Sequence, residues 1–166
     1  AFKDRLIPPK DVEKLQENII LSHAVGTGPE LPAEIVRAMM VIRANTLAMG
    51  HSGIRLETLE LMLSLLNKNI LPIIPSRGSL GASGDLAPLA HMALPLIGQG
   101  EVRFKGKVRT SAEVLEENGL KPVKLSAKEG LALTNGTTLM TAIGALQVHD
   151  AQVVLRSANC AAALSL

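Results

Sequence analysis

A stretch rich in glycine and serine near the middle of the chain constrains the fold more than any other feature. Residues 78–89 read Gly-Ser-Leu-Gly-Ala-Ser-Gly-Asp-Leu-Ala-Pro-Leu, between an apolar run that contains Pro72 and Pro75 and an apolar segment that starts at Leu86. Small residues let backbone segments approach closely and adopt torsion angles that larger side chains forbid. The sequence therefore predicts a tight loop between an extended connection and a helix.

The tripeptide Ala82-Ser83-Gly84 inside this loop can become an electrophile made from the chain itself. If the loop folds back tightly, the amide nitrogen of Gly84 can attack the carbonyl carbon of Ala82. Loss of two water molecules then closes a five-membered ring and turns the Ser83 side chain into an exocyclic methylene. Gly84 leaves its nitrogen unhindered, Ser83 supplies the leaving hydroxyl, and Ala82 adds little bulk beside the ring.

The residues around this tripeptide resemble the signature of the aromatic amino acid ammonia-lyases, and most of all that of the histidine ammonia-lyases. The similarity runs without a break through residues 78–91, which end in Asp-Leu-Ala-Pro-Leu-Ala-His. In that family the triad forms the prosthetic group 4-methylideneimidazol-5-one (MIO). The resemblance therefore implies an MIO group made from Ala82, Ser83 and Gly84, without an external cofactor. The alternative is a phosphate-binding glycine loop, but it lacks the Lys-Ser/Thr of a P-loop, and Asp85 would repel an anion.

Composition favours a helical protein with an aliphatic core. Of the 166 residues, 47% are hydrophobic but only 1% are aromatic, so Leu, Ile, Val, Ala and Met must fill the interior. A net charge of +2 without long basic runs gives no support for nucleic-acid binding. Cys160 is the only cysteine, which fits a reducing compartment. Because no signal peptide or membrane-spanning run is recognisable, we expect a cytoplasmic protein without a membrane partner.

Apolar residues at helical spacing predict helices along most of the chain. The expected long helices cover residues 12–23, 32–49, 56–67 and 86 to about 98. Capping-box sequences that begin at Thr110 and Ser126 predict two further short helices, and residues 101–109 predict a small hairpin. Within the second helix, Arg37 and Arg43 are expected to be solvated or to form salt bridges.

A single long helix is expected from residue 137 to residue 166. Asp150 and Arg156 are its only charged residues, so almost every face is apolar or small. Such a helix belongs in the interior of a large bundle or of an oligomer. The predicted fold class is therefore all-α, mainly a helical bundle with a long buried helix and one small β-hairpin, in a single region that spans residues 1–166.

His23 lies in Leu-Ser-His-Ala-Val-Gly, a segment similar to the Ser-His-Ala stretch of histidine ammonia-lyases, where the histidine faces the substrate. The resemblance implies that His23 hydrogen-bonds a polar substrate ring, which a phenylalanine could not do. A structural role is the alternative, because an imidazolium near a helix end complements the C-terminal dipole.

Asn135 and Leu86 complete the set of candidate site residues. Residues 130–137 match the family's second motif, in which the asparagine contacts the prosthetic group. Asn135 could donate a hydrogen bond to the ring oxygen and could help to hold the loop for cyclisation. Without the resemblance, Asn135-Gly136 is simply a turn signal. Leu86 is predicted to contact the substrate, and no metal site is expected.

The resemblance implies elimination of ammonia from L-histidine, a small amino-acid substrate, to give urocanate. The family takes its strong base from a tyrosine on a loop ahead of the matched region, whereas this sequence contains no Tyr. We therefore expect a fragment of a longer enzyme, completed by its remainder or by other subunits of a homo-oligomer, a tetramer by resemblance. Two alternatives stay open. One is a tyrosine or phenylalanine ammonia-lyase or an aminomutase of the same family, and the other is a non-catalytic helical assembly fragment.

Overall fold

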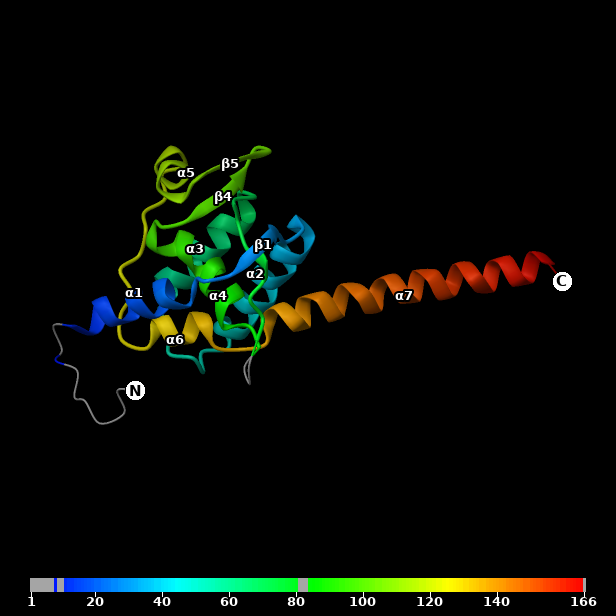
Figure 1. Ribbon diagram of the computed structural model, residues 1–166, viewed down its shortest axis with the longest axis horizontal. Helices are drawn as coiled ribbons and strands as arrows, with labels where there is room; N and C mark the ends of the chain where they lie inside the picture. The colour runs from blue at the N-terminus through cyan, green and yellow to red at the C-terminus, as the bar shows by residue number, and fades with distance from the viewer. Residues whose placement is uncertain (1–7, 9–10, 81–83, 166) are drawn as a thin grey trace.

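A body of packed helices and one long projecting helix make up the architecture (Figure 1). The structure is a computed structural model, and it describes residue 8 and residues 11–80 and 84–165. In chain order the elements are α1 (Val12–His23), β1 (Thr27–Glu30), α2 (Ala33–Ala48), α3 (Leu56–Asn67), β2 (Leu71–Pro72), β3 (Pro75–Arg77), α4 (Leu86–Ala93), a 3-10 helix (Leu94–Ile97), β4 (Glu101–Phe104), β5 (Lys107–Thr110), α5 (Ser111–Glu117), α6 (Glu129–Thr134) and α7 (Thr138–Ser165). The predicted all-α class with a small β element is confirmed.

The described residues contain more β structure than the single predicted hairpin. β4 and β5 form that hairpin, and β2 joins β4 on its other side to make a three-stranded antiparallel sheet. A second sheet pairs β1 with β3. The proline-punctuated run supplies β2 and β3, because proline disfavours helix for the residue before it and tolerates extended backbone. β3 ends at Arg77, immediately before the glycine-rich loop.

The start of α6 differs from the expectation for a capping box at Ser126. The helix begins at Glu129, because Lys128 adopts a left-handed conformation with φ of 73° and so cannot be part of it. Half of the capping box is nevertheless present, since the Glu129 carboxylate accepts a hydrogen bond from the Ser126 amide at 2.7 Å.

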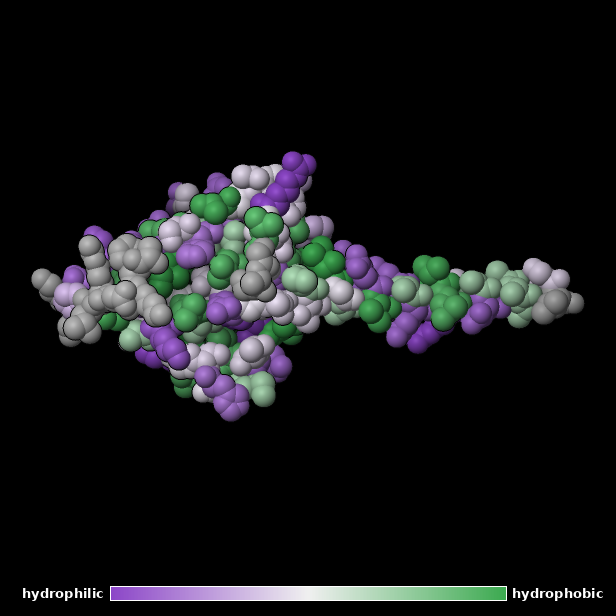
Figure 2. All heavy atoms as spheres, turned by 60° about the horizontal axis from the view of Figure 1, so that its bottom comes forward, coloured by the Kyte–Doolittle hydropathy of each residue, from purple (hydrophilic) through white to green (hydrophobic). Residues whose placement is uncertain are grey.

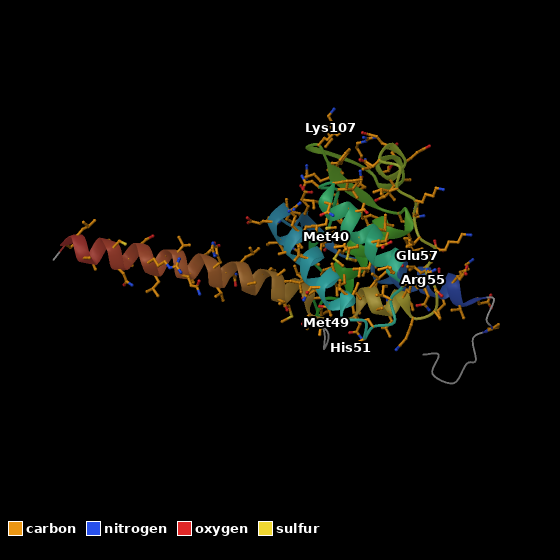
Figure 3. The ribbon with its side chains drawn as sticks, turned by 180° about the vertical axis from the view of Figure 1, so that it is seen from behind. Met40, Met49, His51, Arg55, Glu57 and Lys107 are labelled. Carbon is orange, nitrogen blue, oxygen red and sulfur yellow. The ribbon has the colours of Figure 1, made fainter. Side chains whose placement is uncertain are left out.

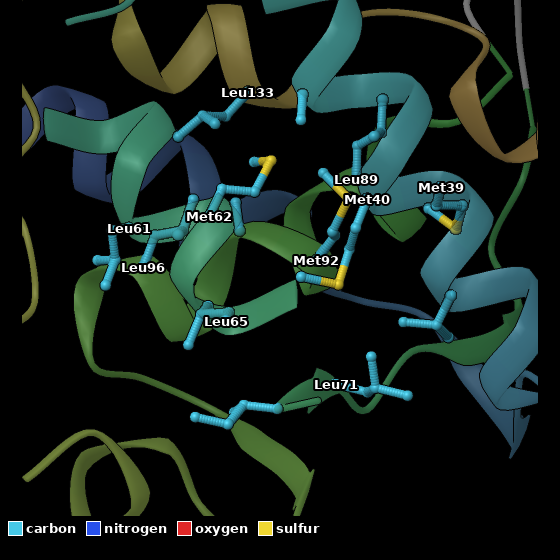
Figure 4. Packing of buried hydrophobic residues seen from close by; sticks show 14 of the residues in the cluster. Met39, Met40, Leu61, Met62, Leu65, Leu71, Leu89, Met92, Leu96 and Leu133 are labelled. Atoms are coloured by element: carbon cyan, nitrogen blue, oxygen red, sulfur yellow. The ribbon is translucent and has the colours of Figure 1, made fainter. Parts of the chain in front are cut away.

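The core is aliphatic, as the composition predicts. Methionines from three helices meet in it, with Met40 of α2, Met62 of α3 and Met92 of α4 each almost fully buried (Figure 4). Leu65 and Leu89 pack in the same hydrophobic cluster. Unbranched methionine side chains fill irregular gaps between helices, which allows a close-packed core with almost no aromatic rings.

Helix α7 has 28 residues, close to the predicted length, and most of it is exposed in this chain. Its expected burial in the interior of a larger bundle or an oligomer stays a prediction. Its only buried residues are Thr138, Leu139 and Ala142, and residues 147–165 are all exposed. The helix runs away from the body, beyond the reach of the other described elements (Figure 1). Green hydrophobic side chains therefore lie on its surface among hydrophilic ones (Figure 2), including Val154 and Leu155.

Neither a membrane helix nor a metal cluster is found in the part of the chain that the structure describes. Within it, no helix combines the length and apolar character needed to cross a bilayer. The same residues contain no group of three or more His, Cys, Asp or Glu side chains that could hold a metal ion.

Candidate functional site

Gly84 marks the exit of the glycine-rich loop, and its geometry requires glycine. Ala82 and Ser83 lie outside the described residues. Gly84 is buried and has φ of 79°, a conformation that residues with a side chain rarely adopt. A Cβ atom at this position would lie 2.9 Å from the Sδ atom of Met140 in α7. Any residue with a side chain would therefore be strained at position 84, which is the position whose amide nitrogen would close the ring.

Asp85 connects both flanks of the loop to the start of α7. Its side chain is fully buried, and Oδ1 accepts a hydrogen bond from the Ser79 hydroxyl at 3.2 Å. Oδ2 accepts another from the backbone N–H of Met140 at 3.1 Å. Met140 lies in the first turn of α7, where backbone N–H groups lack intrahelical partners and the helix dipole favours negative charge. Asp85 flanks α4 as predicted, but its side chain makes no capping hydrogen bond there and binds α7 instead.

Helix α4 starts at Leu86, so its positive end adjoins the loop. First-turn amides lack intrahelical partners and carry the positive end of the helix dipole. That these amides face the ring-forming tripeptide stays a prediction, because Ala82 and Ser83 lie outside the described residues. Pro88 is accommodated in this first turn, because the amide that proline lacks would have no intrahelical partner there. Leu86 is half-buried at the first helical position.

His91, further along α4, joins this helix to the segment that follows α1. Its Nε2 atom accepts a hydrogen bond from the backbone N–H of Gly26 at 3.0 Å. Burial lowers the pKa of His91, which favours the neutral ring that can accept this bond. Gly26 also touches Gly78, since a Cβ atom on Gly78 would lie 3.2 Å from the Gly26 Cα atom. The entrance to the loop, α4 and the end of α1 are thereby fastened together.

His23 is the last residue of α1 and is half-buried. Its Nδ1 atom lies 2.7 Å from the carbonyl oxygen of Ile19, so Nδ1 carries the hydrogen and donates it. This bond leaves Nε2 as the acceptor of a neutral imidazole. Among the described residues, no hydrogen bond joins His23 to Gly84, Leu86 or Asn135.

Asn135 follows the end of α6 and lines a pocket of about 510 Å³ between α2, α6 and the start of α7. Its backbone carbonyl accepts a hydrogen bond from the Arg43 Nη2 atom at 2.8 Å. The next residue, Gly136, has φ of 148°, and a Cβ atom there would lie 2.8 Å from Arg43 Nη1. Asn135 is extended and the chain bends at Gly136, and this bend lies against an arginine from another helix.

Arg43 corrects the expectation that it is solvated or paired with a carboxylate. Its relative exposure is only 4%, and none of the ion pairs among the described residues includes it. It donates instead to the carbonyls of Ala132 and Asn135, and burial lowers the pKa of Arg43. Arg37 is exposed, as predicted, and binds Asn69. Helical spacing could have revealed the difference, because Arg43 follows the buried Met39 and Met40 at i+4 and i+3.

Helix α6, which carries Asn135 at its end, is held in place through Glu129 and Gly130. The fully buried Glu129 carboxylate accepts hydrogen bonds from Arg55 Nε at 2.9 Å and from Thr58 at 2.8 Å, and Arg55 also lies beside Glu57 (Figure 3). Burial acts to raise the pKa of Glu129, but its hydrogen bonds, with that of Arg55 first, outweigh burial and lower the pKa. On the other side, Gly130 N–H donates to the Gln16 side chain at 3.0 Å.

Comparisons with known proteins agree with this geometry. The aromatic amino acid lyase family model matches residues 1–166. The histidine ammonia-lyase of Chloroflexus aurantiacus is 58% identical over 166 residues, which are 100% of this chain and 32% of that protein. The crystal structure of histidine ammonia-lyase from Trypanosoma cruzi superposes with a TM-score of 0.85 at 43% identity, covering 94% of this chain and 30% of that one. The phenylalanine aminomutase of Pantoea agglomerans gives a TM-score of 0.84 at 36% identity, with 91% and 29% covered.

The match therefore covers nearly all of this chain but only part of each relative. The chain spans about a third of the length of the curated relatives that it matches, with 32% covered. Within that third, the family model covers the loop, α4, α6 and α7 together. The chain belongs to the aromatic amino acid lyase family.

Proposed function

We propose that the complete protein eliminates ammonia from L-histidine to give urocanate, through an MIO group formed from Ala82, Ser83 and Gly84. The observation that carries this proposal is the geometry at Gly84 within the family's loop sequence. The residue is buried, adopts φ of 79° and is followed by the start of α4. The histidine ammonia-lyase named among the relatives supports histidine as the substrate.

The residues at the loop fit the prosthetic group. Cyclisation needs an unhindered nitrogen at position 84, and the positive φ together with the closeness of Met140 makes any side chain there strained. Once formed, the ring supplies an electrophile that draws electrons from the substrate, so that the amino group leaves more easily. The first-turn amides of α4 and the Asn135 side chain would stabilise negative charge on its oxygen.

His23 is proposed to select the substrate ring. Its Nδ1–H donates to the Ile19 carbonyl, so a neutral His23 has its acceptor at Nε2. An imidazole substrate can donate an N–H to that acceptor, whereas a phenyl ring cannot. The half-buried Leu86 would supply an apolar contact to the same substrate.

The remaining parts of the site are proposed to come from outside these residues. The sequence has no Tyr, so the base comes from elsewhere in the complete protein. The exposed apolar residues of α7 support packing against further helices, which we assign to the remainder of the enzyme and to the other subunits of a homotetramer. A cytoplasmic location stays a prediction from the single cysteine.

A second candidate is a lyase or aminomutase for another aromatic amino acid. The likeness to phenylalanine aminomutase favours it, because one fold serves both reactions. The test is to offer the complete protein L-histidine, L-tyrosine and L-phenylalanine separately and to identify the products by chromatography. We expect urocanate from histidine. Product from tyrosine or phenylalanine without urocanate would replace the first candidate with the second, and an unmodified loop with no product would leave only the assembly role.

A further inference from the structure

We propose that Arg43 is a positioning residue that sets the direction of the Asn135 side chain by holding the backbone at the end of α6. The structural part of this inference rests on contacts in the chain, and its consequence for catalysis rests on the proposed function of Asn135. Arg43 belongs to α2, far from Asn135 in the sequence, and touches no other candidate site residue that the structure describes.

Arg43 of α2 caps the C-terminal end of another helix, α6. The last carbonyl groups of an α-helix have no intrahelical partner. Arg43 donates to two such groups, on Ala132 in α6 and on Asn135 immediately after it. Both bonds come from Nη2, whose two N–H groups point in fixed directions within the guanidinium plane, whereas the ammonium of a lysine rotates freely. These bonds therefore fix the peptide from which the Asn135 side chain projects.

The charge of Arg43 has no carboxylate to balance it among the described residues. Arg43 is 4% exposed, burial lowers its pKa, and its Nε atom has no hydrogen-bond partner among the described residues. What favours the charge is the negative end of the α6 dipole. An apolar side chain would fill this position with less desolvation, as Met39 and Met40 do on the same face. Packing alone therefore does not account for an arginine here.

Gly136 completes the arrangement. With no side chain, it allows the guanidinium to lie where a Cβ atom would be 2.8 Å from Nη1. The backbone of residues 135 and 136 is thus held from the α2 side, at a residue that lines the pocket between α2, α6 and the start of α7. Small rotations of this peptide would move the amide group relative to a bound substrate or ring, and misplacement on the ångström scale lowers catalytic rates strongly.

The experiment uses the complete protein with Arg43→Met, Arg43→Lys, Asn135→Ala and the double variant Arg43→Met/Asn135→Ala. Arg37→Met is the matched control, because Arg37 lies exposed on the same helix and binds Asn69 instead. We expect Arg43→Met to lower kcat for histidine about tenfold or more while KM changes less than about threefold, and Arg43→Lys to recover part of the loss. The double variant should be no slower than Asn135→Ala alone, because Arg43 acts through Asn135.

Hydrogen–deuterium exchange of the peptide spanning residues 129–137 supplies a readout that does not depend on activity. We expect faster exchange there in Arg43→Met and no change in Arg37→Met. Unchanged exchange, or kcat losses that multiply in the double variant, would overturn the proposal for Arg43. If the unsubstituted protein forms no urocanate but the exchange result holds, the proposed function fails while the positioning of residue 135 stands. Arg43→Lys gives the same readouts if Arg43→Met does not fold.

Discussion

The Asp85 carboxylate accepts a hydrogen bond from the backbone N–H of Met140, 3.1 Å away, and thereby joins the glycine-rich loop to the first turn of α7. The same carboxylate receives the Ser79 hydroxyl from the other flank of the loop. One buried side chain thus connects the entrance of the loop, its exit and the start of α7, and its removal should destabilise the protein. The first prediction tests this.

Asp85→Ala should lower the free energy of unfolding by about 1–3 kcal/mol, because it leaves the Met140 N–H and the Ser79 hydroxyl without their acceptor. Asp85→Asn is the control, since its amide oxygen can still accept from one of the two donors, and we expect it to lose less. Urea unfolding measures both. Equal losses would show that the charge near the start of α7, and not the hydrogen bonds, carries the stabilisation.

Glu129 should make stability fall in acid. Its pKa is lowered in the folded state, so the unfolded chain binds its proton more readily and stability rises with pH across this interval. The contribution is fully present above the ordinary glutamate pKa of about 4.3 and is lost as pH falls through the lower folded value. Urea unfolding between neutral pH and about pH 3 measures it. Glu129→Gln should show a shallower dependence on pH, and an identical slope would contradict the assignment.

Gly130→Ala should destabilise the protein by about 1–3 kcal/mol, although alanine normally favours helix by about 1 kcal/mol. The added Cβ atom would lie 2.7 Å from the backbone oxygen of Gln16, which cannot move without shifting α1. Gly144→Ala in α7 is the matched control, since a Cβ atom there meets nothing within 4 Å. The control should be neutral or stabilising in thermal unfolding. A neutral Gly130→Ala would mean that α1 and α6 are not closely packed.

Ring formation predicts an intact mass lower by about 36 Da, corresponding to two waters lost from the new covalent electrophile. Ser83→Ala should show the full mass calculated from its own sequence, because no hydroxyl remains to be eliminated. Mass spectrometry of the complete protein, with peptide mapping of residues 78–91, makes the measurement. A complete and folded protein that shows the full unmodified mass would remove the MIO group from the proposed function.

His23→Phe should lower kcat/KM for histidine by roughly tenfold or more and improve the relative value for phenylalanine. The reason is the acceptor at Nε2, which an imidazole ring can use and a phenyl ring cannot. Steady-state kinetics of the complete protein with both substrates give the comparison. An equal fall for both would indicate that His23 serves only to end α1.

Much of the fold could be predicted because local signals and packing agree. Helix α3 runs from Leu56 to Asn67, as its apolar residues indicate, and α1 ends at His23, as expected. The strand pairs β1–β3 and β2–β4 could not be found in this way, because they join short segments that are distant in the sequence. Pairing of that kind depends on tertiary packing more than on local preference.

The resemblance named the candidate site residues, which stay predictions, but it did not indicate the contacts that hold them. The resemblance led to Gly84 and Asn135, yet nothing local indicated that Arg43 holds the Asn135 carbonyl. Arginine is usually exposed, and only its position among buried residues of α2 departs from that pattern. The apolar character of α7 could be predicted from its composition, whereas the exposure of residues 147–165 in this chain could not.

The structure of the glycine-rich loop depends on residues outside it. A segment of residues 78–91 transplanted into another helical protein would carry Asp85 and His91, but it would leave behind the backbone N–H groups of Met140 and Gly26 that they bind. A buried polar group left without its hydrogen-bond partner, as the Asp85 carboxylate would be, costs about 1–3 kcal/mol. A host protein for this loop must therefore also supply two backbone N–H groups, one in the first turn of a helix and one on a glycine. Both must lie within hydrogen-bonding distance of the loop.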